Sequence, residues 1–262
     1  MYSVLQKYSA KVIHFIHRNK VFPKKNISSH LIKAFPFIKH ALYMAIDKKN
    51  IVFDLGGILL DIHPQRTFEA FAALGADRAV LSEAYTLANN TMMGYEMGLI
   101  STEELYSFIA SLLPRQTREM PTDALQSRIR DAWRALIGEL PLYKWQRLTQ
   151  LRRQGHKLFL LSNTNSLHWE QIVCNIEQIE GKRVEEYFDS IFLSYKMHRC
   201  KPDKEIFEKA FELAECTAAE SVMVGDRLDN DIIPAKALGM KTVWIKQGMG
   251  QYYVVRSAEE RP

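Results

Sequence analysis

Five short apolar segments punctuate this 262-residue sequence and restrict it to a small set of folds. They span residues 51–53, 156–163, 189–195, 221–226 and 241–246. Polar residues or glycine follow each segment, and helix-length patterns lie between them, such as 203–214, where apolar residues recur at i, i+3 and i+4. Strands that alternate with helices and have no polar face are typical of a parallel sheet covered on both sides. We therefore expect a doubly wound α/β fold around a parallel five-stranded sheet.

A long insertion separates the first apolar segment from the second. The interval is about a hundred residues, far more than one crossover helix needs. Its central part, 63–140, is rich in helix-forming residues and contains no strand-like run. Four prolines stand at plausible helix boundaries: Pro64, Pro114, Pro121 and Pro141. We predict a helical cap domain over 63–140 and an α/β core domain made of 46–62 and 141–262.

The positive charge of the chain is concentrated in its first residues. Residues 1–43 contain eight Lys or Arg and no Asp or Glu; subtracting this +8 from the total of +5 leaves −3 for the remainder. A slightly acidic folded part gives no support for nucleic-acid binding. Residues 1–45 are therefore predicted to be a basic extension: a membrane-surface or anionic-partner segment, an organelle-targeting segment, or sequence upstream of a true start at Met44. We favour the last, because the sequence from Met44 runs directly into the first strand.

The cysteines and the hydropathy pattern indicate the compartment. Cys174, Cys200 and Cys216 form no CxxC pair and are odd in number, which favours a reducing compartment without disulfides. No apolar run approaches the ~20 residues of a membrane-spanning helix. We expect a cytoplasmic protein with no integral membrane segment, and the sequence leaves open whether it is a monomer or a homodimer.

An acidic loop follows the fourth apolar segment. The sequence VGDRLDND places Asp226, Asp229 and Asp231 within six residues. Carboxylates this close repel one another unless a cation lies among them, and Mg²⁺ prefers such oxygen ligands together with water and phosphate. A solvated turn that caps the next helix explains this loop equally well on its own.

Other polar residues also stand where predicted strands end. Asp54 follows the first strand, Ser162 and Asn163 follow the second, and Lys201 precedes a helix. Each alone fits an ordinary turn or surface position. In open parallel sheets, however, ligands bind beyond the carboxyl ends of the strands. Together these residues supply a nucleophilic carboxylate, anion donors, a cation and a metal loop, which is what attack on a phosphoryl group requires.

Four segments resemble, in the same order, the motifs of the haloacid dehalogenase (HAD) superfamily of hydrolases. They are FDLGGILLD, LSNTNS, CKPDKEIF and VGDRLDND, and the resemblance covers residues 51–246. It is closest to the sugar-phosphatase-like branch with a helical cap between the first two motifs, which includes alpha-glucose-1-phosphate phosphatases. It implies a HAD-like Rossmannoid core with strand order 5-4-1-2-3.

The resemblance also implies roles for the matching residues. Asp54 is the expected nucleophile and forms an aspartyl-phosphate. Ser162 and Asn163 bind the phosphate, and Lys201 neutralises both the nucleophile and the phosphate.

A magnesium site is implied in the same way. Mg²⁺ is expected to be held by Asp54, the backbone carbonyl of Gly56 and Asp226, with Asp231 as a ligand or as a partner of the ligands. Asp229 falls outside the family's pattern.

Gly56 departs from the pattern of most phosphatases of the superfamily. They carry an aspartate at this position as general acid, and the loss of a positioned acid forfeits ~10² to 10⁴-fold in rate. Relatives in the sugar-phosphatase branch also have glycine there. Asp61, His63 or a cap residue would have to supply the proton, or the leaving group must depart easily, as in anomeric sugar phosphates.

The predicted function is hydrolysis of a small phosphorylated metabolite, with a sugar phosphate favoured. Two alternatives remain: a catalytically impaired regulator that binds phosphate, and a metal-independent dehalogenase, against which the intact acidic loop argues.

Five large cap residues fit helix packing better than a pocket: Tyr85, Met92, Met93, Tyr95 and Trp133. His168 and Trp169 lie closer to the predicted site, and segment 246–253 is predicted to be a loop.

Overall fold

The computed structural model describes residues 49–81, 91–246 and 251–253. The chain divides into two compact units, 1–36 and 37–262. The predicted extension 1–45 lies outside the described residues, and its interpretation stays a prediction. Among the described residues, no helix has both the length and the apolar character needed to cross a membrane.

The described strands form one six-stranded sheet in the order β3-β2-β1-β4-β5-β6. They are β1 (Asn50–Phe53), β2 (Lys157–Ser162), β3 (Ser190–Leu193), β4 (Ser221–Gly225), β5 (Lys241–Lys246) and β6 (Gln251–Tyr253). The first five pair in parallel, which confirms the predicted sheet and, read from the opposite edge, its order 5-4-1-2-3. β6 pairs antiparallel with β5, although its residues were predicted to be loop. The edge of β5 provides this pairing, and a local sequence pattern cannot reveal such a partner.

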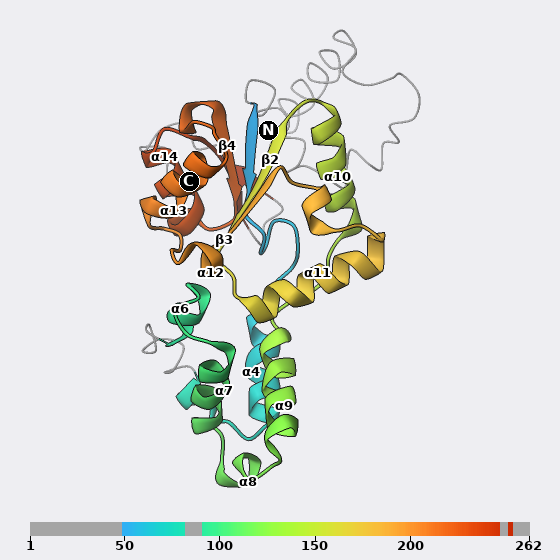
Figure 1. Cartoon of the computed structure of the whole chain (residues 1–262), viewed down its shortest axis with the longest axis vertical. Coiled ribbons are helices and arrows are strands. Elements are labelled where there is room, and N and C mark those ends of the chain that lie inside the picture. The colour runs from blue at the N-terminus through green and yellow to red at the C-terminus, as the bar shows by residue number, and fades with distance from the viewer. Residues whose placement is uncertain (1–48, 82–90, 247–250, 254–262) are drawn as a thin grey trace, which may run out of the picture. The chain divides into compact units, whose positions relative to one another are not determined.

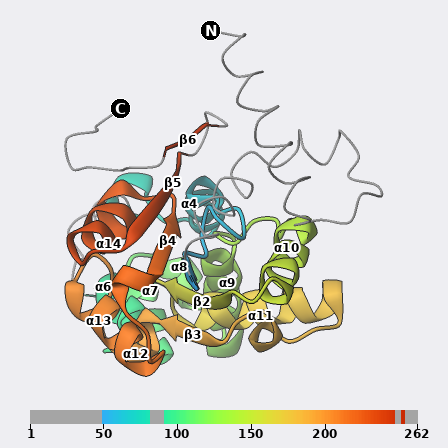
Figure 2. The same ribbon diagram turned by 90° about the horizontal axis from the view of Figure 1, so that it is seen from above.

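Helices cover both faces of this sheet (Figures 1 and 2). One face carries α10 (Leu142–Arg153) and α11 (Ser166–Glu180), and the other carries α13 (Lys204–Leu213) and α14 (Ile233–Ala237). Successive residues of β1 alternate between them: Ile51 and Phe53 pack with the first pair of helices and Val52 with the second. Both faces are therefore apolar, which is why the strands read as continuous hydrophobic runs.

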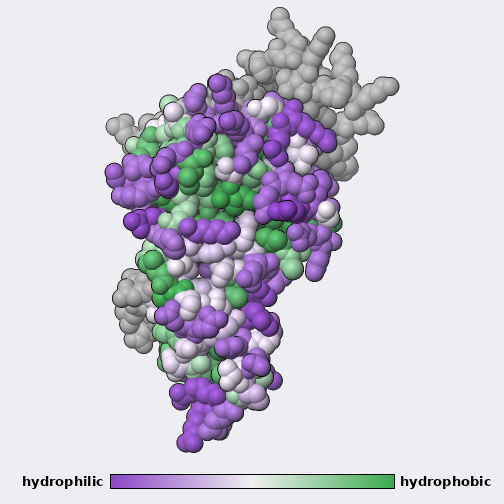
Figure 3. Space-filling model, in the orientation of Figure 1, coloured by the Kyte–Doolittle hydropathy of each residue, from purple (hydrophilic) through white to green (hydrophobic). Residues whose placement is uncertain are grey.

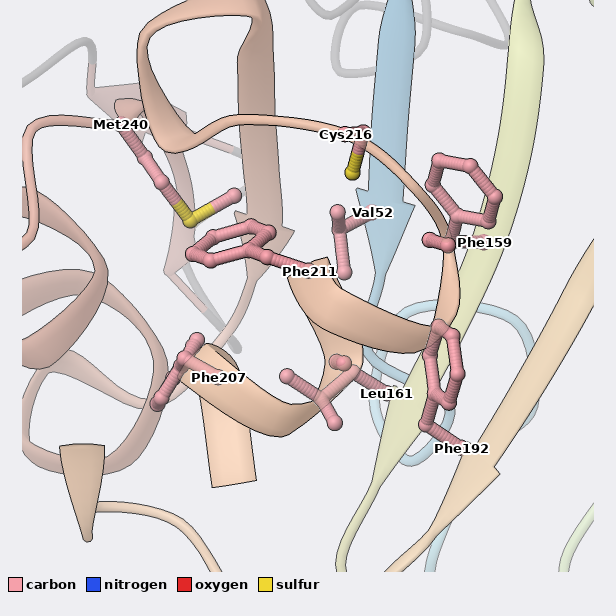
Figure 4. A pocket seen from close by; sticks show the side chains of 10 residues that line it. Val52, Phe159, Leu161, Phe192, Phe207, Phe211, Cys216 and Met240 are labelled. Atoms are coloured by element: carbon pink, nitrogen blue, oxygen red, sulfur yellow. The ribbon is translucent and has the colours of Figure 1, made fainter. Parts of the chain in front are cut away.

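A small cavity lies on the face that α13 covers (Figure 4). Its lining is apolar and includes Val52, Phe159, Leu161, Phe192, Phe207, Phe211, Cys216 and Met240. None of these side chains carries a charge or a strong hydrogen-bond donor, so the cavity cannot hold a phosphate. It is a gap in the packing rather than a candidate active site.

Of the six helices that the structure describes between β1 and β2, all but α10 form an insert. They are α4 (Pro64–Ala73), α6 (Thr91–Glu96), α7 (Thr102–Ser111), α8 (Arg115–Arg118) and α9 (Thr122–Arg134). The predicted prolines stand at helix starts: Pro64 is the first residue of α4, and Pro114, Pro121 and Pro141 directly precede α8, α9 and α10. The predicted core and cap domain boundaries stay predictions.

The insert has its own apolar core and lies beyond the carboxyl ends of the strands (Figure 1). Met92, Tyr95 and Trp133 are buried in that core, in agreement with a packing role, whereas Met93 is exposed. Tyr85 lies outside the described residues. The surface over α8 is hydrophilic (Figure 3). The other end of the insert faces the carboxyl ends of the strands (Figure 1).

Candidate active site

Asp54 occupies the carboxyl end of β1, beside β4. Its N–H donates to the carbonyl of Val224 (2.9 Å), which continues the pairing of the two strands by one residue. The chain then coils, with the N–H of Leu59 bonded to the carbonyl of Leu55 (2.8 Å). Gly57 has a φ of 71°, a conformation that favours glycine. Gly57 thus allows the tight turn that leaves the Asp54 carboxylate at the edge of the sheet.

Lys201 connects three strand ends through one ammonium group. Its Nζ donates to Asp54 Oδ1 (2.7 Å), to Asp231 Oδ1 (2.6 Å) and to the carbonyl of Leu161 (2.9 Å). These bonds use all three donors of the ammonium. The side chain is 2% exposed. Burial alone would lower the pKa of Lys201, but Asp54 and Asp231 outweigh it and raise this pKa above its ordinary value, so the group stays cationic.

Asn163 holds the backbone of Lys201. Its Oδ1 accepts from the N–H of Lys201 (2.8 Å), and its Nδ2 donates to the carbonyl of Lys201 (2.8 Å). The predicted phosphate contact through Asn163 stays a prediction, because the structure uses its carboxamide to position the lysine. Ser162 is buried beside it, and its hydroxyl makes a long contact of 3.4 Å with the carbonyl of Asn163.

Asp54, Asp226 and Asp231 form a carboxylate cluster. One oxygen from each lies within 4.8 Å of the others. Burial raises the pKa of Asp54 to about 7 against the opposing charge of Lys201, and Asp231 and Asp226 add to the rise. Burial also raises the pKa of Asp226 to about 6, with a further contribution from Asp231. One lysine thus faces three carboxylates, and this uncompensated negative charge fits a divalent cation.

The turn after β4 fixes the position of Asp231. Its Oδ2 accepts from the backbone N–H of Arg227 (3.0 Å), so both of its oxygens are engaged. The approach is close enough that a Cβ at Gly225 would collide with the Asp231 side chain. Asp229, which falls outside the family's pattern, pairs with Arg227 at the surface (2.9 Å).

Asp61 and His63, two of the predicted replacements for an acid at Gly56, both have partners. Asp61 pairs with the buried Lys144 at the start of α10 (3.6 Å), and the charges of Asp61 and Asp226 partly offset the lowering of the Lys144 pKa by burial. His63 hydrogen-bonds with Glu139 (3.0 Å) at an exposed position. Neither candidate is a free acid.

A second network, absent from the sequence-based predictions, joins α9 of the insert to the loop after β2. Trp133 Nε1 donates to Asn165 Oδ1 (3.3 Å), and Asn165 Nδ2 lies 3.1 Å from His168 Nδ1. The ring of His168 closes the circuit, with its Nε2 at 2.9 Å from the carbonyl of Trp133. That carbonyl can only accept, so Nε2 carries the proton and Nδ1 is the acceptor. Burial lowers the pKa of His168 to about 4, so the ring is neutral.

Comparison with known proteins places the chain in a family. The model of the haloacid dehalogenase-like hydrolase family matches residues 48–239, and the chain belongs to this family. The match includes the strand ends that carry Asp54, Lys201 and the carboxylate cluster.

Two curated relatives are phosphatases. The D-ribitol-5-phosphate phosphatase of Bacteroides thetaiotaomicron is 31% identical over 204 residues, which are 76% of this chain and 93% of the relative. The glyceraldehyde 3-phosphate phosphatase of Pyrococcus abyssi is 37% identical over 102 residues, 38% of this chain and 40% of that protein.

Solved structures show the same fold. A HAD family enzyme from Bacteroides thetaiotaomicron, crystallised with magnesium and inorganic phosphate, is 31% identical and superposes with a TM-score of 0.68 over 77% of this chain and 96% of that one. A predicted HAD-like hydrolase from Porphyromonas gingivalis, 24% identical, has a TM-score of 0.63 over 77% of this chain and 93% of that one.

Proposed function

We propose that this protein is a Mg²⁺-dependent phosphatase that hydrolyses a small sugar phosphate through an aspartyl-phosphate on Asp54. The observation that carries the proposal is the lysine shared by two carboxylates: Lys201 Nζ lies 2.7 Å from Asp54 and 2.6 Å from Asp231 at the carboxyl edge of the sheet. Support also comes from the relatives, which include phosphatases of D-ribitol 5-phosphate and glyceraldehyde 3-phosphate.

The reaction has two steps in which Asp54 is first consumed and then restored. A carboxylate oxygen of Asp54 bonds to phosphorus while the bond between phosphorus and the sugar oxygen breaks, and the leaving oxygen takes a proton from solvent water. A second water then attacks the phosphorus of the aspartyl-phosphate, the bond between phosphorus and the Asp54 oxygen breaks, the attacking water gives its proton to solvent, and inorganic phosphate and the free carboxylate are released. The hydroxyl of Ser162 donates to the phosphoryl oxygens in both steps, and the positive charge of Lys201, which stays bonded to Asp54, Asp231 and Leu161, offsets their negative charge.

The carboxylate cluster fits a magnesium ion. Asp54, the backbone carbonyl of Gly56 and Asp226 would hold it, with Asp231 behind them because Lys201 and Arg227 already engage both of its oxygens. When bound, the ion offsets the repulsion between the carboxylates and the phosphoryl dianion.

The leaving group narrows the substrate class. No acid stands at position 56, and Asp61 and His63 are engaged with Lys144 and Glu139. A leaving group that departs easily is therefore favoured, and this feature supports the branch that includes alpha-glucose-1-phosphate phosphatases. Equal turnover of anomeric sugar phosphates and simple alkyl phosphates would count against this finer assignment.

Phosphate release from a panel of phosphorylated metabolites tests the proposal. We expect turnover of sugar and polyol phosphates with Mg²⁺, fastest for anomeric sugar phosphates, none with EDTA, and none with Asp54→Asn in either condition. A folded protein that binds Mg²⁺ but turns over no compound would instead be a phosphate-binding regulator. Activity that survives in EDTA would contradict the metal assignment.

A further inference from the structure

Four consecutive residues of the insert, 95–98, contact the loops that surround the carboxylate cluster. We call them the docking strip. The hydroxyl of Tyr95 lies 2.9 Å from Ser166 Oγ, directly after the loop that follows β2. The carbonyl of Glu96 accepts from Ser194 Oγ (2.6 Å), and Ser194 also accepts from the backbone N–H of Thr164 (2.9 Å). One buried serine thus ties the docking strip to the loops after two strands.

The rest of the docking strip rests on the helical turn after β3. The carbonyl of Met97 lies 2.9 Å from His198 Nδ1. Gly98 has a φ of 64°, and a Cβ there would collide with the backbone carbonyl of Tyr195. Glycine therefore permits a backbone contact that no other residue would allow. These contacts fix the backbone on both sides of Glu96.

The side chain of Glu96 is the one part of the docking strip that can bear a charge. It is half-buried, and within the described ranges its carboxylate has no hydrogen bond or ion pair. Burial raises its pKa, and the charge of Arg227 opposes the rise. Arg227 follows Asp226 in the chain and is itself paired with Asp229.

A second observation locates the same carboxylate near Lys201. The charge of Glu96 contributes to the raised pKa of Cys200, after burial and Asp203. Cys200 directly precedes Lys201, whose ammonium contacts Asp54. The Glu96 carboxylate therefore lies within electrostatic range of the loops that carry Asp226 and Lys201.

We propose that Glu96 determines specificity by accepting hydrogen bonds from hydroxyl groups of the sugar or polyol part of the substrate. The proposal rests on the proposed phosphatase function. The charge of Lys201 and the hydroxyl of Ser162 suit the phosphate, whereas the rest of a polyol phosphate presents hydroxyl donors. The carboxyl oxygens of Glu96 can accept hydrogen bonds from these hydroxyls, and the charge of Arg227 favours the ionised form, whose hydrogen bonds are stronger. A substrate without hydroxyl groups cannot form these hydrogen bonds with Glu96.

Two substrates of different leaving group separate recognition from catalysis. D-ribitol 5-phosphate carries hydroxyls on its leaving group, and p-nitrophenyl phosphate carries none. We expect Glu96→Gln to lower kcat/KM for the polyol phosphate about 10- to 100-fold, mainly through KM, and to change it less than about twofold for the aryl phosphate. Glu103→Gln, on the exposed surface of α7 in the same insert, is the matched control and should change neither value.

A structural role for Glu96 would lower kcat/KM equally for both substrates and would overturn the proposal, as would no change in either. Calorimetry gives a readout that does not depend on turnover. In the Asp54→Asn background we expect Glu96→Gln to weaken binding of D-ribitol 5-phosphate about 10-fold or more and to leave binding of inorganic phosphate unchanged. Unchanged binding of both contradicts the role of Glu96. Absence of turnover by the wild-type protein would contradict the phosphatase instead.

Discussion

The carboxylate cluster and the contacts of the insert are built from different kinds of interaction. At the strand ends, a buried ammonium is shared by Asp54 and Asp231, so the geometry depends on opposite charges in close contact. Between insert and core, the buried contacts include the neutral network of Trp133, Asn165 and His168, and the ion pair of Arg134 with Glu170 is more exposed. Removing one partner of a buried ion pair costs about 3 to 5 kcal/mol, whereas a buried neutral donor or acceptor that loses its partner costs about 1 to 3 kcal/mol. The carboxylate cluster should therefore be the more sensitive of the two regions to the loss of one side chain.

The largest effect is expected from Lys201→Met, which removes the cation from the cluster. The uncompensated carboxylates should lower the free energy of unfolding by about 3 to 5 kcal/mol, and kcat should fall by about 10² to 10³-fold. Mg²⁺ should raise the Tm of this variant more than that of the wild type, because the ion then supplies the missing positive charge. Thermal denaturation with Mg²⁺ and with EDTA measures both effects.

Lys204→Met is the control for that measurement, because Lys204 is exposed and pairs with Glu208 on the surface of α13. It should change the free energy of unfolding by less than about 0.5 kcal/mol. Equal Tm values for the two variants would show that the buried ammonium does not compensate the cluster.

Gly56→Asp should restore the acid that the sequence lacks. The backbone φ at Gly56 lies outside the left-handed region, and a Cβ would meet the Ile62 side chain at 3.4 and 3.7 Å. Ile62 is 42% exposed and can shift to make room. We expect kcat for a simple alkyl phosphate to rise by about 10²-fold, and kcat for p-nitrophenyl phosphate to change little, because its leaving group needs no proton. Gly56→Asn, which has a similar shape but no acid, should not raise kcat; an equal gain would refute the explanation.

The carboxylate cluster could be predicted from the sequence because each of its members follows a strand. Buried parallel strands are continuous apolar runs, and functional residues stand at their carboxyl ends, so Asp54, Ser162, Lys201 and the acidic loop could be located one by one. The family resemblance then supplied their roles. The same reasoning gave β1 to β5 but not β6, whose strand conformation depends on an edge of the sheet formed elsewhere.

The contacts between the insert and the core could not be predicted from the sequence, because the residues that form them are far apart in the chain. Ser194 and the carbonyl of Glu96 are 98 residues apart in the chain, and no local period relates them. Trp133 was predicted to pack in the insert, which is confirmed, and the placement of His168 near the site stays a prediction; the network of the two residues depends on how α9 meets α11. Likewise Asn163 was expected to bind phosphate, and its carboxamide is bonded to Lys201, 38 residues away.

The hydrogen-bond network of Trp133, Asn165 and His168 should make the free energy of unfolding fall in acid. His168 has an ordinary pKa of 6.5 and one of about 4 in the folded protein, so between these values the unfolded chain binds more protons. The contribution of His168 to the free energy of unfolding is therefore complete above pH 6.5. It falls by about 3 kcal/mol as the pH falls towards 4. Protonation would place a second donor on Nδ1, facing the Asn165 amide. Urea denaturation between pH 4 and 7 measures this loss.

His168→Gln is the comparison for that titration. The raised pKa values of Asp54 and Asp226 act in the opposite direction and are common to both proteins, so the difference between wild type and variant isolates the histidine. The difference in free energy of unfolding should shrink towards pH 4. A difference that stays constant with pH would mean that His168 is not held neutral by the fold.

The smallest effect is expected from Lys144→Met. This substitution compares the cost of removing Lys144 with the cost of removing Lys201, which is also buried. The carboxylate of Asp61, the ion-pair partner of Lys144, is 47% exposed, whereas Asp54 and Asp231, which share Lys201, are 11% and 1% exposed. When Lys144 is removed, water can solvate Asp61, so the free energy of unfolding should fall by only about 1 to 2 kcal/mol. Because Lys144 also lies within electrostatic range of Asp226, its loss should strengthen Mg²⁺ binding, which calorimetry measures directly. A destabilisation as large as that of Lys201→Met would show that the exposure of the partner does not set the cost, and that both lysines belong to one coupled charge network.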